Sequence, residues 1–290
     1  MTIASTTPTA DADTFKFAIR HQWDQAAPGW NEHSPQIRKW LQLATEAMLE
    51  MAGVRRGARV LDVAAGAGDQ TIDIAQKVGP DGYVLATDLS PSILDFAKLN
   101  AQRAGYDNVD TLVADGESLK IDPVSFDAAV CRLGLMLFPD PRQGLQEMYE
   151  ALKPGGGVCT MVFSKAEMNP CITTLLSTAL KHAGQHSRDP YQPGSLLSLG
   201  KPGLIDEMFR AAGFKDVATT RIDAPFSLPS ARDYLAFIRT SASPLKQILG
   251  KLSAEAADAA WNEMEERLTI FNTADGWTGP NELLLTAAKR

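Results

Sequence analysis

The chain has few cysteines, and they are not arranged to bind a metal. Its 290 residues include only Cys131, Cys159 and Cys171. These form no C-x-x-C pair and no spacing typical of metal ligands. Cys131 and Cys159 lie in apolar runs, where a thiol usually serves as a small core residue. We therefore predict no metal site.

Basic residues and long apolar runs are also lacking. Acidic residues outnumber lysine and arginine by 35 to 28, which gives a formal net charge of −7 and argues against a nucleic-acid substrate. No apolar run approaches the roughly twenty residues that cross a bilayer, and the N-terminal residues lack the pattern of a signal peptide. We expect a cytoplasmic protein with a small-molecule partner and no integral membrane segment, and leave open whether it forms a homodimer.

The most informative segment of the chain is Arg59–Thr71, with the sequence R-V-L-D-V-A-A-G-A-G-D-Q-T. The apolar run at its start predicts a strand that is buried on both faces. Gly66 and Gly68 then predict a turn, because glycine allows positive φ and close approach to a ligand. A helix is expected from Thr71, and its free N–H groups could face an anionic or polar ligand group. This segment therefore predicts a nucleotide-binding unit, with an ordinary strand-to-helix turn as the alternative.

Two residues indicate which nucleotide this unit binds. The dinucleotide pattern G-x-G-x-x-G would place its third glycine at position 71, which is Thr71. Asp62, at the end of the predicted strand, would repel a pyrophosphate. The same carboxylate suits the ammonium and sulfonium groups of S-adenosylmethionine.

A second acid follows the next predicted strand. Asp88 ends the run Gly82–Asp88, about twenty residues after the glycine turn, where a carboxylate can accept both ribose hydroxyls. We include the adjacent Leu89 with Asp88 as an expected cofactor-binding residue. Ser90-Pro91 is typical of a helix start, so a helix-capping role for Asp88 is the alternative.

The order of these features resembles motif I and the following strands of class I S-adenosylmethionine-dependent methyltransferases, with Ala64 where the family usually has a first glycine. The segment Phe126–Asp140 resembles the fourth strand and loop of the ubiquinone/menaquinone C-methyltransferase-like group. Leu-Lys-Pro-Gly-Gly at 152–156 is a further feature of that group, and residues 153–157 predict a tight turn into the fifth strand. The sixth strand is expected over residues 214–226. The Asn-Pro-Pro-Tyr loop of nucleic-acid amino-methylating enzymes is absent. The resemblance runs from about residue 60 to 163 and returns at the last two strands.

The resemblance implies a doubly wound α/β fold with a seven-stranded, mostly parallel sheet, whose last strand is antiparallel between strands five and six. It places Asp115 against the adenine amino group, with Gly116 leaving room for the ring. It also suggests that Trp30 closes over the cofactor, whereas Trp23 and Trp40 would anchor helix packing. Arg132 would either line the pocket or form a surface ion pair.

Together, these interpretations give a set of cofactor-binding residues for S-adenosylmethionine and leave the catalytic residue unassigned. The set is Asp62, Ala64, Gly66, Gly68, Asp88, Leu89, Asp115, Gly116, Arg132 and Trp30.

The expected domain organisation is a disordered tail over residues 1–13, an N-terminal helical cap over 14–57, and a methyltransferase domain over 58–290. The domain would carry cap insertions at 164–201 and 230–279. Because open α/β sheets bind ligands at the carboxyl ends of their strands, we expect apolar residues of both insertions to line the acceptor pocket. These residues are Leu175, Leu176, Leu196, Leu197, Phe237, Ile238 and Trp261.

The expected function is methyl transfer from S-adenosylmethionine to carbon or oxygen of a small aromatic or quinone-like acceptor. One alternative is an N-methyltransferase for an amine or a phospholipid head group. The other is a nucleotide-binding module without catalysis, for example one that senses NAD. Residues of the helical cap and the two insertions choose the acceptor, and they match the family only loosely.

Overall fold

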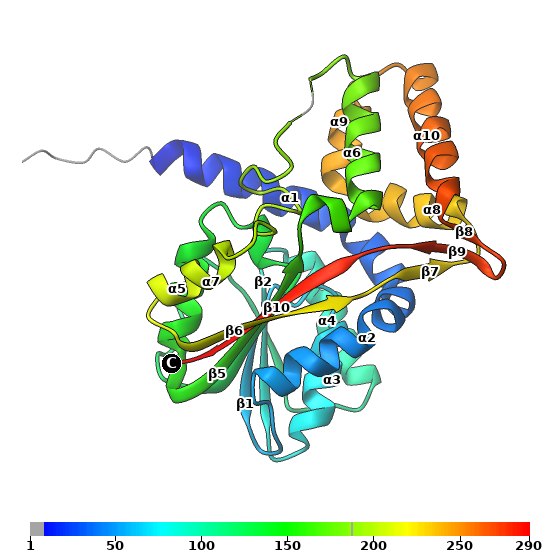
Figure 1. Cartoon of the computed structure of the whole chain (residues 1–290). Coiled ribbons are helices and arrows are strands. Elements are labelled where there is room, and N and C mark those ends of the chain that lie inside the picture. The colour runs from blue at the N-terminus through cyan, green and yellow to red at the C-terminus, as the bar shows by residue number, and fades with distance from the viewer. Residues whose placement is uncertain (1–8, 187) are drawn as a thin grey trace, which may run out of the picture.

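The computed structural model describes residues 9–186 and 188–290 (Figure 1). Residues 1–8 of the predicted tail lie outside the described residues. The remainder of that tail is helical, because helix α1 spans Thr9–Glu32. Among the described residues, no helix is both long and apolar enough to span a membrane.

One sheet of seven strands organises the chain, in the order β3-β2-β1-β4-β5-β10-β6. Its strands are β1 Arg59–Val63, β2 Tyr83–Asp88, β3 Val109–Val113, β4 Phe126–Arg132, β5 Leu152–Phe163, β6 Lys215–Asp223 and β10 Glu282–Lys289. Strands β1 to β5 pair in parallel, and β10 lies antiparallel between β5 and β6. The predicted fold class is therefore confirmed. The strand order reverses between β1 and β4, where open sheets of this type bind ligands.

Helices cover both faces of this sheet. They are α2 Ser34–Met51, α3 Asp69–Val78, α4 Pro91–Arg103, α5 Pro141–Ala151 and α7 Leu204–Ala211. Arg132 of β4 points to the α2 face, where it meets Thr45. Thr219 of β6 points to the opposite face, where it meets Asp206 of α7. Strands β1 and β4 are almost fully buried between these layers, as their apolar runs predict.

Two boundaries differ from the sequence prediction. The predicted turn at 153–157 is part of the extended segment β5, with a register shift against β4 between Phe126 and Ala128. The predicted sixth strand divides into β6 and the short strand β7 (Phe226–Leu228). Strand β7 joins a second sheet with β9 (Gly276–Gly279) and β8 (Asn272–Thr273), which was not predicted.

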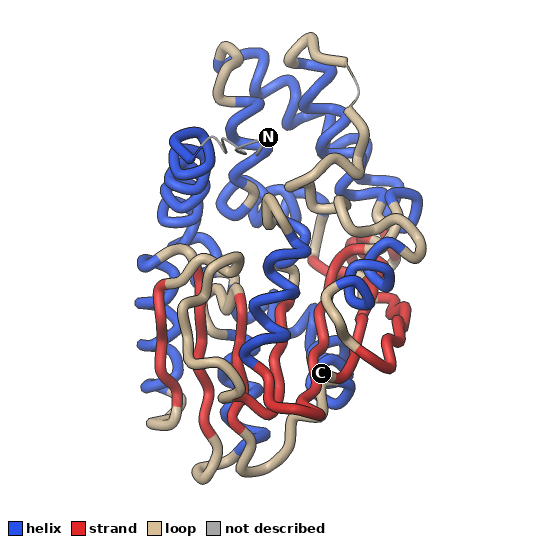
Figure 2. The backbone as a smooth tube through the Cα atoms, turned by 90° about the vertical axis from the view of Figure 1, so that its left-hand side faces the viewer, coloured by secondary structure: helices blue, strands red, loops and turns tan. Residues whose placement is uncertain are grey.

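The remaining helices form a group beyond one end of the sheet. They are α6 Pro170–His182, α8 Ala231–Ser241, α9 Ser243–Leu249 and α10 Ala254–Leu268. Figures 1 and 2 show this group on the same side of the strands as α1. Three short 3-10 turns complete the described elements: η1 Leu135–Leu137, η2 Ala166–Met168 and η3 Thr269–Phe271.

Candidate functional site

A cavity lies at the carboxyl ends of β1, β2 and β4, beneath helix α1. Its volume is about 1150 Å³ including its open mouth. The lining comes from α1, α2 and the loops that follow the strands. It comprises Lys16, Ile19, Trp23, Trp30, Ile37, Trp40, Leu41, Val63, Ala64, Ala65, Gly66, Ala67, Asp69, Gln70, Thr87, Asp88, Leu89, Ile93, Ala114, Asp115, Gly116, Glu117, Arg132, Leu133, Gly134, Leu137, Phe138 and Pro139.

The loops after β1 and β4 meet at the floor of this cavity in a constrained backbone conformation. Ala64 and Leu133 both have φ of 57°, in the left-handed region that non-glycine residues rarely adopt. A Cβ on Gly134 would lie 2.4 Å from the Cβ of Ala64, so only glycine fits there. Such conformations are often found at functional sites, where the surrounding structure holds them.

Asp88 lines the cavity and is held by the backbone around it. Its carboxylate accepts hydrogen bonds from the N–H of Gly66 at 3.1 Å and of Ser90 at 3.0 Å. Burial raises the pKa of this carboxyl, and these N–H groups act against the rise. The N-cap of α4 is Ser90, whose side chain accepts from Ile93 N–H, so Asp88 is not the cap. Asp88 therefore has the placement that a ribose-binding carboxylate requires.

Asp115 and Glu117 form an acidic corner of the cavity with Lys16 of α1. The Lys16 ammonium pairs with both carboxylates, at 2.6 Å from Glu117. A Cβ on Gly116 would lie 2.3 Å from the ring of Phe138. The missing side chain at Gly116 therefore makes room for Phe138, and Gly116 itself lines the cavity.

Two of the predicted cofactor residues do not line the cavity. Asp62 is fully buried, and its carboxylate accepts from Thr71 Oγ1 at 2.6 Å and from Gln70 Nε2 at 3.2 Å. It ties the first turn of α3 to β1. Gly68 packs against α4, because a Cβ there would lie 2.9 Å from the Cα of Ala97. Neither residue is placed to touch a ligand in this cavity.

Asp62 makes the stability of the fold depend on pH. Burial raises its pKa from the ordinary 3.8 to about 6. Between these values the folded protein holds a proton that the unfolded chain has lost. The contribution of Asp62 to the free energy of unfolding therefore falls as the pH rises from about 4 to about 6.

We expect Asp62→Asn to remove this dependence. From pH 4 to pH 7 the wild type should lose up to about 3 kcal/mol of stability relative to the variant, at about 1.4 kcal/mol per pKa unit. Urea unfolding of both proteins at the two pH values measures the difference. Parallel pH dependence in the two proteins would show that Asp62 stays ionised.

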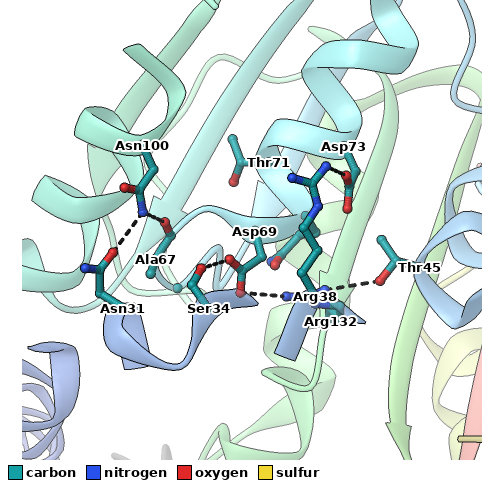
Figure 3. A network of polar contacts seen from close by, with 12 residues as sticks. Asn31, Ser34, Arg38, Thr45, Ala67, Asp69, Thr71, Asp73, Asn100 and Arg132 are labelled. Carbon is teal, nitrogen blue, oxygen red and sulfur yellow. Dashed lines mark hydrogen bonds and ion pairs between the residues drawn. The ribbon is translucent and has the colours of Figure 1, made fainter. Parts of the chain in front are cut away.

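A buried ion pair between Asp69 and Arg132 lies in the cavity wall (Figure 3). Nη2 of Arg132 is 3.6 Å from the Asp69 carboxylate, and Nη1 donates to Thr45 Oγ1 at 3.1 Å. Ser34 Oγ also donates to Asp69. Burial raises the pKa of the Asp69 carboxyl, whereas the charge of Arg132 lowers it. Arg132 is thus both cavity-lining and ion-paired, but in the interior rather than on the surface.

The sequence prediction missed Asp69, although a signal was present. It is the first residue of α3 and directly follows the glycine turn, where a carboxylate at a helix N-terminus is favourable. Arg132 has five N–H donors, and within the described residues its side-chain partners are Thr45 and Asp69. The ion pair therefore has capacity to bind a further charged group.

Tryptophan side chains of α1 and α2 supply much of the apolar wall. Trp23 and Trp30 contact each other with ring centroids 6.0 Å apart. Trp40 lies on α2, close to Ile37 and Leu41 in the sequence, and all three line the cavity. The cavity position expected for Trp30 is found. Trp23 and Trp40, which were expected only to anchor packing, also line the cavity.

The two insertions do not line the cavity as expected. None of the seven apolar residues predicted for this role is among the lining residues. Leu196 is exposed, and the others are buried or half-buried elsewhere in the fold. The described histidines also lie outside the lining. His182 pairs with Glu263 at 2.8 Å on the surface of that group. The structure therefore offers no histidine base at this site.

Comparison with known proteins assigns the family. Residues 35–224 match the model of the ubiE/COQ5 methyltransferase family. The chain belongs to this family. This confirms the expected class, an S-adenosylmethionine-dependent methyltransferase, at the level of the family.

Two curated relatives carry the same name, ubiquinone/menaquinone biosynthesis C-methyltransferase UbiE. The protein from Hahella chejuensis is 37% identical over 43% of this chain and 50% of its own length. The protein from Idiomarina loihiensis is 32% identical over 58% of this chain and 71% of its own length. The chain thus spans about half the length of several of the curated relatives it matches.

Solved structures with low sequence identity share the fold. The YcgJ protein of Bacillus subtilis superposes with a TM-score of 0.59 at 19% identity, over 86% of this chain and 98% of its own. Phosphoethanolamine N-methyltransferase 2 of Haemonchus contortus was solved in complex with S-adenosyl-L-methionine. It superposes with a TM-score of 0.53 at 18% identity, over 90% of this chain and 57% of its own. At these identities the likeness concerns the fold alone.

Proposed function

We propose that this chain transfers a methyl group from S-adenosylmethionine to a small, flat, apolar acceptor of the phenol or quinol type. The observation that carries the proposal is that three kinds of side chain line one cavity. They are the carboxylates of Asp88 and Asp115, the buried Asp69–Arg132 ion pair, and the tryptophans of α1 and α2.

The two carboxylates fit the adenosine part of the cofactor. Asp88 would accept the ribose hydroxyls, with the loop of Ala64 and Gly66 below and Leu89 beside it. Asp115 would accept from the adenine amino group, in exchange for part of its pairing with Lys16. Charge-assisted hydrogen bonds of this kind are stronger than neutral ones.

The ion pair fits the amino-acid end of the same cofactor. Arg132 would bind the carboxylate, and Asp69 would bind the ammonium that the sequence suggested for Asp62. A free amino acid group carries both charges, so a buried pair of opposite sign is complementary to it. Trp30 would cover the cofactor from α1.

The chain then has to hold an acceptor behind the methyl group for in-line displacement. Bound S-adenosylmethionine supplies a methyl that is already activated by the sulfonium. Ile37, Trp40 and Leu41 can orient a flat apolar ring and keep water away. Orientation of this kind can provide about 7–11 kcal/mol of acceleration. The printed names of the UbiE relatives support carbon as the methylated atom.

A methyl-transfer assay tests this proposal. The protein is incubated with S-adenosylmethionine that carries a labelled methyl group and with a panel of phenols, reduced naphthoquinones and amines. We expect label in the phenol or quinol products and an equal amount of S-adenosylhomocysteine. Label only in amines would favour an N-methyltransferase. Binding of S-adenosylhomocysteine without any transfer over the panel would favour a non-catalytic module.

A further inference from the structure

The C-terminal helical unit, residues 225–279, lies beyond the part of the chain that matches the family model. It contains β7, α8, α9, α10, β8 and β9. It contributes no residue to the cavity lining. It does contact two residues that line the cavity, Trp30 and Trp40.

Trp40 is fixed by a hydrogen bond and by stacking. Its indole N–H donates to the carbonyl of Ala224 at 2.7 Å, immediately before the unit. Its ring stacks on Phe226 of β7, with centroids 4.7 Å apart and an interplanar angle of 14°. Phe226 is buried and meets Phe237 edge to face at 5.5 Å. Phe163 of β5 also stacks against this indole, with centroids 6.3 Å apart. Phe226, which does not line the cavity, is therefore one of two phenylalanines that orient Trp40.

Trp30 is fixed by helix α8 in a similar way. Its indole N–H donates to the carbonyl of Ser241 at 3.3 Å, and Phe237 meets its ring edge to face at 6.1 Å. The neighbouring Gly29 packs on the same helix, because a Cβ there would lie 2.8 Å from the carbonyl oxygen of Thr240. Phe237 thus supports Trp30 directly and Trp40 through Phe226.

We propose that the C-terminal helical unit sets the acceptor selectivity of the site by holding Trp30 and Trp40 as a rigid wall. Phe226 and Phe237 are the positioning residues. This rests on the proposed function, in which a flat apolar ring lies against that wall. If a tryptophan ring could rotate, the width of the space left for the acceptor ring would change. Asp88 and Asp115 lie on other loops and do not depend on these contacts.

Two substitutions test the positioning role. Phe226→Leu and Phe237→Leu keep an apolar side chain and remove the aromatic contact. The Km and kcat/Km are measured for a one-ring phenol and a fused two-ring naphthol, and the Kd is measured for S-adenosylhomocysteine. We expect the preference between the two acceptors to change about threefold to tenfold, as the usual strength of an aromatic pair implies. The Kd for S-adenosylhomocysteine should change less than about twofold in Phe226→Leu, whose direct contact is with Trp40. Phe237 also contacts Trp30, which covers the cofactor, so Phe237→Leu is judged on the acceptor preference alone.

The matched control is Met264→Leu, because Met264 is fully buried on α10 in the same unit. It should leave the acceptor preference unchanged. Phe226→Tyr keeps the aromatic ring and should therefore keep the wild-type preference. An unchanged preference in both leucine variants would overturn the proposal. An equal loss of S-adenosylhomocysteine affinity in Phe226→Leu would also overturn it, because the effect would then be general.

Acceptor binding separates this inference from the proposed function. Calorimetric titration of naphthol and phenol into protein saturated with S-adenosylhomocysteine compares the same variants without turnover. A wild type that binds naphthol but transfers no methyl would contradict the proposed function, and the preference of the variants would still decide the positioning role. A wild type that binds neither acceptor would overturn both.

Discussion

Replacing Asp88 by alanine is expected to weaken the binding of S-adenosylhomocysteine by about tenfold to a hundredfold, the usual effect of losing charge-assisted hydrogen bonds. The carboxylate already accepts from Gly66 and Ser90 N–H, which fixes it at the edge of the cavity. Its remaining lone pairs are available to the ribose hydroxyls. Isothermal titration calorimetry at constant pH measures the affinity, and urea unfolding measures stability separately.

Asp95→Ala is the matched control, because Asp95 is an exposed carboxylate on the neighbouring helix α4. It should change neither quantity. The Asp88 variant should bind 5′-methylthioadenosine as poorly as it binds S-adenosylhomocysteine, since both contain the ribose. If the Asp88 variant is less stable but binds both ligands as the wild type does, the carboxylate only organises the loop before α4.

Replacing Arg132 by methionine is expected to lower the affinity for S-adenosylhomocysteine by about a hundredfold, in line with the loss of a buried hydrogen-bonded charge partner. Asp69 would then face the ligand carboxylate with no cation between them. Removing one partner of a buried ion pair also destabilises a fold by about 3–5 kcal/mol. Arg132→Lys keeps the positive charge, and its affinity is measured instead if the methionine variant does not fold.

The ligand series makes this second prediction specific. The compound 5′-methylthioadenosine lacks the amino-acid end, so neither variant at position 132 should change its affinity. Equal loss of both ligands would mean that Arg132 supports the cavity as a whole. Unchanged binding of S-adenosylhomocysteine by a folded methionine variant would show that the ion pair serves the fold or the acceptor instead.

The sheet was predictable from the sequence because its determinants are local. The apolar runs of β1 and β4 and the glycine turn after β1 each fit one type of element. The resemblance supplied the strand order and the antiparallel β10. The small second sheet escaped prediction, because its strands are two to four residues long and their pairing joins segments about fifty residues apart.

The site was predictable in part, and the errors have a common cause. Sequence places Asp62 at the end of a strand but not on the face or edge that meets a ligand. In the structure its carboxylate turns to Thr71, and Asp69 takes the cavity position seven residues later. Trp40 was similarly ambiguous, because a tryptophan can pack on one side and line a cavity on the other. Such choices depend on tertiary packing, which a single segment does not encode.

The insertions show the same limitation at a larger scale. The sequence shows correctly that the insertions carry apolar residues and leave the sheet at its binding edge. The prediction that these apolar residues line the pocket was wrong. Helices α1 and α2 occupy that position, and the C-terminal helical unit packs behind them. Long-range contacts such as Trp40 to Ala224 decide this arrangement.

The central claim is that the cavity binds S-adenosylmethionine rather than a dinucleotide, and one calorimetric comparison tests it most directly. S-adenosylhomocysteine and NADH are titrated separately into the wild-type protein under the same conditions. We predict saturable binding of S-adenosylhomocysteine at one site per chain and no measurable heat of binding from NADH, whose pyrophosphate would add negative charge to a cavity already lined by Asp88, Asp115 and Glu117. Binding of NADH with no binding of S-adenosylhomocysteine would contradict the account.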